Sequence, residues 1–190
     1  MNRTTRNLAV AAFFVFVVLA AAVAGEDPGR PLVRGSAQLK TSTFSMGVEL
    51  FEFGGDFGFG ASLTSPWFLG NHAAVRVSGF AAYRDTGWNP YFGVRAGLAG
   101  GTLMSSADIR LYGDGGLLVL FPSALSDSSD AVFGGYGRFG FEFFIDPAES
   151  GVSYFMELGA NGVAAIADRE PGAPLYANGF SVTTGLRLYL

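Results

Sequence analysis

The sequence predicts an all-β protein, an eight-stranded antiparallel up-and-down transmembrane β-barrel. Three observations lead to this prediction. The chain divides into eight segments of roughly 10–14 residues in which polar and apolar side chains alternate, as barrel strands do. Charged residues within these segments fall on the polar face, and large aromatic residues fall on the apolar face. The pattern contains no amphipathic helix that could cover the apolar face, so lipid is its simplest cover.

The composition indicates one apolar domain. The 190 residues are enough for a single domain, and only 15% of them are charged, against a usual share of roughly 25%. The chain has no cysteine, which excludes a disulfide framework, a thiolate metal site and a lipid-modified N-terminal cysteine. Its basic residues are scattered singly, so we expect no nucleic-acid partner.

A signal peptide is expected at residues 1–24. Arg3 and Arg6 precede an apolar run over 8–23, and Ala22 and Ala24 are small residues at the −3 and −1 positions before Gly25. This run is shorter than the roughly 20 residues of a membrane-spanning helix. Cleavage would remove two arginines and no acid, which changes the net charge from −4 to −6. Residues 25–41, rich in Pro, Gly and charge, are interpreted as an irregular periplasmic lead-in.

The barrel domain is expected over residues 42–190. Its predicted strands cover residues 42–53, 57–68, 73–83, 91–104, 109–121, 132–145, 152–163 and 177–190. The breaks between them contain Gly, Pro, Asn, Asp and Ser, which favour turns. An even number of strands places both ends of the domain on one side, the periplasm, so the longer breaks should face outward. Glu52 interrupts the alternation of the first segment and is interpreted as a bulge or the strand's end.

The charges of the strands are expected to form a network in the lumen. An eight-stranded barrel is just wide enough to be filled by side chains, and buried charges must pair. Five arginines then face four acids: Glu49, Arg76, Arg95, Arg110, Asp114, Arg138, Glu142, Glu157 and Arg187. We interpret this set as structural packing, although a catalytic site or a selectivity lining would use the same residue types.

Two further expectations concern small and aromatic residues. The inward glycines Gly58, Gly60, Gly93 and Gly97 should leave room for the long charged side chains. Aromatic residues near strand ends should lie at the membrane interfaces, where such residues are enriched. These aromatic residues are Trp67, Tyr83, Trp88 and Tyr91.

The remaining motifs predict no chemistry. Residues 135–140 match G-x-G-x-x-G but lie inside a strand pattern, without the helix that a dinucleotide site needs. His72 is the only histidine and falls in a predicted periplasmic turn, which argues against a Ser-His-acid site and a transition-metal site. Asp127 and Asp130 are interpreted as solvated loop residues, since calcium needs six or more oxygen ligands. We therefore expect no enzyme, cofactor or metal.

The C-terminal segment carries a family resemblance. Thr184, Gly185, Leu188 and Leu190 follow the pattern of a barrel-assembly signal: polar, Gly, two free positions, hydrophobic, free, hydrophobic. With the signal peptide and the strand pattern, the chain resembles the small eight-stranded outer-membrane β-barrel proteins of bacteria over roughly residues 42–190. That family often ends in Phe, and Leu190 departs from it. The resemblance implies an outer-membrane address and recognition by the barrel-assembly machinery.

The resemblance does not imply an activity, because such barrels include adhesins, tethers, conduits and lipid-modifying enzymes. We expect a monomer surrounded by outer-membrane lipid, with a structural or surface-interaction role carried by its outward loops. The alternatives are a passive conduit for small or apolar molecules and an enzyme that modifies outer-membrane lipid. A soluble periplasmic barrel that binds an apolar ligand is a further alternative, and it would need the opposite parity, with its apolar face inside.

Overall fold

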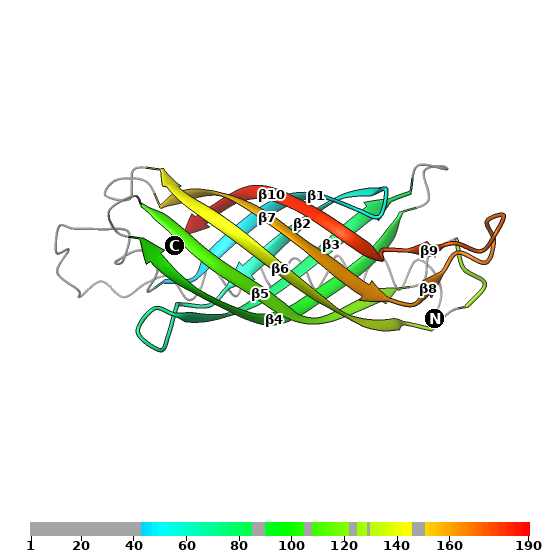
Figure 1. Cartoon of the computed structure of the whole chain (residues 1–190), viewed down its shortest axis with the longest axis horizontal. Helices are drawn as coiled ribbons and strands as arrows, with labels where there is room; N and C mark the ends of the chain where they lie inside the picture. The colour runs from blue at the N-terminus through cyan, green and yellow to red at the C-terminus, as the bar shows by residue number, and fades with distance from the viewer. Residues whose placement is uncertain (1–42, 85–89, 105–107, 122–124, 129, 146–150) are drawn as a thin grey trace.

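The computed structural model describes residues 43–84, 90–104, 108–121, 125–128, 130–145 and 151–190 (Figure 1). The predicted signal peptide and lead-in, together with Trp88, lie outside the described residues and stay predictions. No helix in the described part of the chain is long and apolar enough to cross a membrane.

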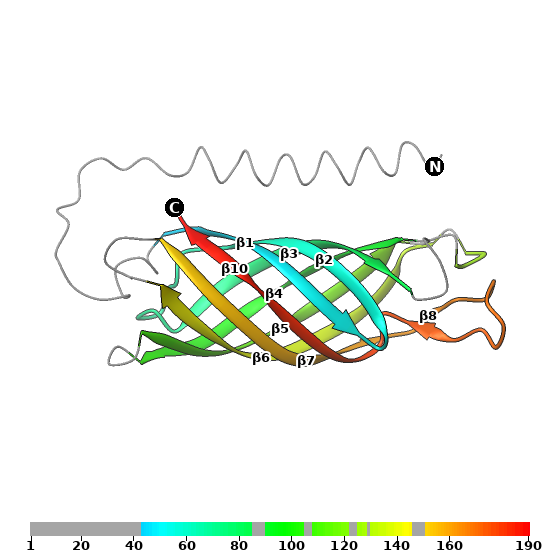
Figure 2. The same ribbon diagram turned by 90° about the horizontal axis from the view of Figure 1, so that it is seen from above.

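The eight long strands close into an antiparallel barrel (Figures 1 and 2). Each long strand pairs with the long strands before and after it, and the last pairs with the first, so that none of these eight strands has a free edge. This confirms the predicted all-β fold, a closed antiparallel barrel of eight strands. The strands are β1 (Ser45–Phe53), β2 (Asp56–Thr64), β3 (Ala73–Tyr83), β4 (Tyr91–Met104), β5 (Ile109–Phe121), β6 (Val132–Ile145), β7 (Val152–Val163) and β10 (Gly179–Tyr189).

The strand bounds agree with the prediction from β3 to β7 and differ at the other strands. β2 ends at Thr64 rather than residue 68, because Pro66 has no N–H for the ladder and Trp67 then turns into the barrel. β10 begins at Gly179 rather than residue 177. The break before it contains a two-stranded ribbon that was not predicted, formed by β8 (Ala165–Ile166) and β9 (Leu175–Tyr176).

The interpretation of Glu52 as a bulge or strand end was wrong. β1 pairs without interruption with both β2 and β10 from Ser45 to Phe53. Phe51 and Phe53 point into the lumen and are fully buried, whereas Glu52 lies on the outer surface. The alternation of inward and outward residues therefore continues to the end of β1. It looked interrupted in the sequence because the inner face carries two large aromatic residues beside Glu49, and the outer face carries Glu52.

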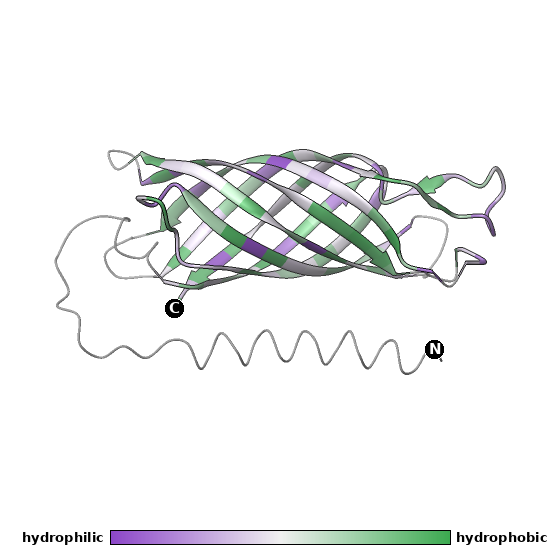
Figure 3. Cartoon of the chain, turned by 90° about the horizontal axis from the view of Figure 1, so that it is seen from below, coloured by the Kyte–Doolittle hydropathy of each residue, from purple (hydrophilic) through white to green (hydrophobic). Residues whose placement is uncertain are grey.

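Hydrophobic and hydrophilic residues alternate along the strands (Figure 3), and the large apolar side chains are exposed on the outside of the barrel. The outer surface of β6 carries Phe133, Phe139, Phe141 and Phe143, and Phe133 is 73% exposed. The charged side chains of the strands are buried instead, apart from Glu52. The opposite parity, which a soluble barrel with an apolar interior would need, is not the one observed.

Aromatic clusters close both ends of the lumen. We call the end of the barrel that carries the β8–β9 ribbon the loop end. We call the opposite end, where β1 begins and β10 finishes, the turn end. At the turn end Trp67 is buried with Tyr112, and at the loop end Tyr91 is buried with Phe53 and Phe80. The expectation that Trp67 and Tyr91 lie at the membrane interfaces was therefore wrong, because both rings point into the lumen.

Candidate functional site: the lumenal charge network

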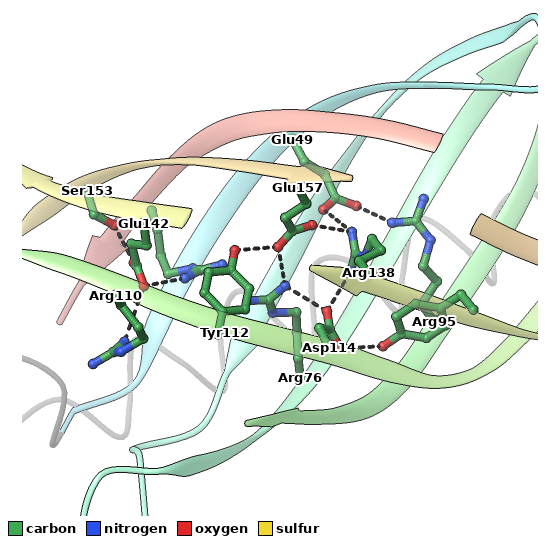
Figure 4. A network of polar contacts seen from close by, with 12 residues as sticks. Glu49, Arg76, Arg95, Arg110, Tyr112, Asp114, Arg138, Glu142, Ser153 and Glu157 are labelled. Atoms are coloured by element: carbon green, nitrogen blue, oxygen red, sulfur yellow. Dashed lines mark hydrogen bonds and ion pairs between the residues drawn. The ribbon is translucent and has the colours of Figure 1, made fainter. Parts of the chain in front are cut away.

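All nine residues proposed for the lumenal network are buried inside the barrel, and none is more than 6% exposed. They come from seven of the eight long strands, because period-two alternation turns the same face of every strand inward. They form two groups of ion pairs and hydrogen bonds, one around Asp114 and Glu157 and one around Glu142 (Figure 4). Some of these contacts cross the lumen between strands that are not neighbours in the sheet, such as Arg76 with Asp114 and Arg138 with Glu49.

The middle of the network is a closed arrangement of two arginines and two acids. Arg76 lies 2.7 Å from Asp114 and 2.6 Å from Glu157, and Arg138 lies at the same distances from these two acids. The hydroxyl groups of Tyr136 and Tyr112 donate to Asp114 (3.0 Å) and Glu157 (2.6 Å). Each carboxylate thus has two arginines and one tyrosine hydroxyl as partners, which compensates for the loss of its water.

Glu142 organises the part of the network nearest the turn end. Its carboxylate accepts hydrogen bonds from Ser153 (2.5 Å) and Tyr189 (2.7 Å), and it lies 2.9 Å from Arg187 and 3.2 Å from Arg110. The guanidinium carbon of Arg110 in turn lies 4.0 Å from the ring centroid of Trp67. The indole ring therefore covers this part of the network at the turn end.

Arg95 occupies the side of the network nearest the loop end. It pairs with Glu49 at 3.2 Å, and Glu49 also lies 3.6 Å from Arg138. The guanidinium carbon of Arg95 packs 5.0 Å from the ring of Phe51 and 4.6 Å from that of Phe80. Arg95 is therefore the boundary between the charged part of the lumen and the aromatic cluster of the loop end.

Glycines make room in the lumen, mainly for aromatic rings rather than for the charged side chains as expected. A Cβ at Gly93 would collide with the ring of Phe80, and one at Gly58 would collide with the ring of Phe51. Of the four predicted positions, Gly60 is the one that faces a charged group, since a Cβ there would lie 3.1 Å from a carboxylate oxygen of Glu49.

The hydroxyl partners of the acids and the aromatic closures were not predicted. Tyr112, Tyr136, Tyr189 and Ser153 share the parity of the charged residues, so strand alternation could have found them. Trp67 carries no such signal, because it follows the end of β2 in a turn whose path depends on tertiary contacts.

The four residues of the expected assembly signal lie on β10 or just after it. Leu188 and Leu190 are partly exposed on the outer surface. The Thr184 hydroxyl donates to the carbonyl oxygen of Phe155 (3.1 Å) and lies within hydrogen-bond distance of the Tyr154 hydroxyl (2.8 Å). A Cβ at Gly185 would collide with the carbonyl oxygen of Val48 and the ring of Phe155. These contacts stabilise the folded barrel, and recognition by the assembly machinery stays a proposal.

His72 lies in the turn between β2 and β3, at the turn end. Its Nδ1 is 3.0 Å from the carbonyl oxygen of Gly101 and 3.3 Å from the Thr102 hydroxyl. These contacts join the β2–β3 turn to the last residues of β4. Among the described residues, no group of three or more His, Cys, Asp or Glu side chains is placed to hold a metal ion.

The carboxylates of the network are enclosed by their partners. The side chains of Asp114, Glu142 and Glu157 are 0% exposed, and each is engaged by arginine. A general acid or base must reach the substrate by a hydrogen bond, directly or through one water molecule. Carboxylates enclosed by ion pairs and closed off by aromatic rings do not offer such a contact in this conformation.

Comparison with known proteins identifies a similar fold but shows no family for this chain. No protein-family model matches the sequence, and no curated protein matches it significantly. Among solved structures, the N-terminal β-barrel domain of OprF from Pseudomonas aeruginosa is similar, with a TM-score of 0.52 and 13% sequence identity. The match covers 77% of this chain and 96% of that one. This chain has the fold of that barrel domain. At such low identity the likeness concerns the fold alone.

Proposed function

We propose that this protein is a monomeric bacterial outer-membrane β-barrel, secreted with the signal peptide 1–24, whose loop end has a structural or surface-interaction role. The observation that carries the proposal is the distribution of side chains: paired charges inside a closed barrel and large apolar residues exposed around it. In water such a surface would be an aggregation hazard, whereas in a bilayer it faces the acyl chains.

The filled lumen favours a structural or surface-interaction role over that of a conduit or an enzyme. Five buried arginines and their acids occupy the middle of the barrel, and aromatic clusters close both ends. A conduit needs a continuous path for its solute, and an enzyme needs a carboxylate or nucleophile that its substrate can reach. We therefore assign the role to the loop end, where the longer connections lie.

The first test is the gel mobility of the mature chain, residues 25–190, folded in detergent. A closed barrel resists the detergent until it is heated, so the boiled and unboiled samples are expected to migrate differently. A chain that shows no heat-dependent shift and stays soluble without detergent would overturn the proposal.

The second test concerns location and orientation, and it uses the absence of cysteine from the chain. Single cysteines replace the exposed residues Asp130 at the loop end and His72 at the turn end. In intact cells a membrane-impermeant maleimide is expected to label Asp130→Cys, and to label His72→Cys only after the envelope is opened. Labelling of His72→Cys alone in intact cells would show the opposite orientation.

A further inference from the structure

The charge network is balanced in one of its two groups and unbalanced in the other. The group around Asp114 and Glu157 joins three carboxylates to three arginines, namely Glu49, Asp114, Glu157, Arg76, Arg95 and Arg138. The group around Glu142 (Figure 4), which we call the turn-end group, joins one carboxylate to two arginines, Arg110 and Arg187. The turn-end group therefore carries an excess of one positive charge.

The two arginines of the turn-end group share one oxygen atom of their acid. Nη1 of Arg187 lies 2.9 Å and Nη1 of Arg110 lies 3.2 Å from Oε2 of Glu142. The other oxygen, Oε1, accepts hydrogen bonds from Ser153 and Tyr189. Among the described residues, no second carboxylate lies within ion-pair distance of either arginine. One carboxylate thus neutralises one of two guanidinium groups that are both enclosed in the barrel.

The turn-end group also contains hydrogen-bond donors that have no protein partner. Unpartnered donors occur on all five lumenal arginines, but only here do they accompany an excess charge. Nε and Nη2 of Arg110 and of Arg187 make no hydrogen bond to a described residue, and neither does Nε1 of Trp67. Guanidinium and indole N–H groups donate and cannot accept. Native proteins leave few buried donors unpaired, so this region calls for an acceptor.

The aromatic rings beside the turn-end group do not balance its charge. The guanidinium carbon of Arg110 lies 4.0 Å from the ring centroid of Trp67 and 5.3 Å from that of Phe144, and Arg187 lies 4.7 Å from that of Phe155. Such rings attract a cation through their quadrupole but carry no net charge. A water molecule would satisfy donors without neutralising the excess, and a buried uncompensated charge is costly. An anion would do both.

We propose that the turn-end group binds one small monovalent anion of the halide type, with chloride as its probe, between Arg110 and Arg187. The excess of one positive charge sets the charge of the ligand. The enclosure limits its size, because Trp67 is 4% exposed and the side chain of Glu142 is 0% exposed. The anion would be taken up as the barrel closes. This inference goes beyond the surface role and does not rest on it, so the two can fail separately.

The first test compares the stability of the folded chain in sodium chloride and in sodium gluconate. Both salts supply a monovalent anion at the same ionic strength, but gluconate is too large for an enclosed site. Unfolding in lipid vesicles is induced with urea, because guanidinium chloride would itself supply the anion. A ligand that binds only the folded state stabilises it, so we expect the folding equilibrium constant at a fixed urea concentration to be at least about tenfold higher in chloride.

Removing the excess charge should remove the dependence on chloride. Arg110→Gln leaves Glu142 paired with Arg187 alone, so the two salts should differ by less than about twofold. Arg138→Gln is the matched control, because it removes a buried arginine from the balanced group and should keep the full dependence. Equal dependence in Arg110→Gln and the unmodified chain, or no dependence in the unmodified chain, would overturn the site.

The second test detects the anion beside Trp67 and needs no substitution within the network. Trp88→Phe leaves Trp67 as the only tryptophan. Bromide, a halide close to chloride in size, quenches indole fluorescence at short range. For the chain folded in bromide, we expect quenching that saturates and that added chloride reverses at constant bromide. Quenching that rises linearly and ignores chloride would show collision from solvent, and absence of quenching would show no bound halide. Either result would overturn the proposal even if Arg110→Gln does not fold.

Discussion

Glu157 shows how single residues hold the interior together. It accepts a hydrogen bond from Tyr112 and pairs with Arg76 of β3, across the lumen, and with Arg138 of the neighbouring strand β6. Removing one member of a buried ion-pair network is strongly unfavourable, because the remaining charges stay buried without compensation. We therefore expect a substitution that removes one charge of the network to destabilise the barrel, even when the new side chain has a similar shape.

We expect Glu157→Gln to lower the free energy of unfolding by about 3–5 kcal/mol, the usual penalty for breaking a buried ion pair. The measurement is urea-induced unfolding of the barrel in lipid vesicles, followed by tryptophan fluorescence. Asp130→Asn removes one negative charge from an exposed loop and serves as the control, with an expected change near zero. A value for Glu157→Gln close to that of the control would show that the network does not contribute to stability.

At the level of elements, the pairing of β1 with β10 decides whether the barrel closes. Nine consecutive residue pairs join these strands, from Ser45 with Tyr189 to Phe53 with Ser181. Gly185 lies in this seam, where the ring of Phe155 and the backbone of Val48 leave no space for a Cβ. Gly137 on β6 has no atom within 4 Å of the position a Cβ would take, so it provides a matched glycine in a long strand.

Gly185→Ala is therefore expected to destabilise the barrel and slow its folding into vesicles, with an overpacking penalty of about 1–3 kcal/mol. Gly137→Ala is expected to be neutral or slightly stabilising, because alanine restricts the unfolded chain more than glycine does. Folding yields can be measured on a gel of unboiled samples, as the fraction of the protein in the band whose mobility changes on boiling. Equal losses in both variants would mean that the seam is not specially packed.

At the level of the whole molecule, the lumen is closed three times along its length. Trp67 covers the turn end, ion pairs fill the middle, and the cluster that contains Phe53, Phe80 and Tyr91 fills the loop end. Ion conduction requires a wetted path or a chain of sites that exchange water for protein ligands. A lumen whose charged side chains are nearly inaccessible offers neither.

The purified barrel in a planar lipid bilayer is accordingly expected to show no steady single-channel conductance. Arg84→Gln, which removes the ion pairs of Arg84 with Asp56 and Glu170 at the loop end, is expected to stay silent as well, because the charge network remains in place. Stable current steps from either protein would contradict this expectation and favour the conduit. A current that appears only with Arg84→Gln would show that contacts at the loop end alone close the lumen.

The strands, their inward faces and the pool of buried charges could be predicted from the sequence, because period-two alternation is a local property of the chain. The bounds of β3–β7 follow from it directly. Alternation also assigns Tyr112, Phe51 and Phe80 to the inner face, although it cannot say which charge each ring contacts. Those partners lie across the lumen on strands far apart in the sequence, and their contacts depend on the register with which the barrel closes.

The closures of the lumen depended on tertiary structure alone. Trp67 turns inward because the chain after Pro66 leaves the ladder. Residues 164–178 are held at the loop end by contacts with Asp56 and Arg84 and with the loop before β6, where Arg169 pairs with Asp127. These residues lie in turns and loops without a hydrophobic period, where long-range contacts rather than local propensity select the path of the chain. Local patterning thus determined the wall of the barrel, and contacts between distant segments determined how it is filled and closed.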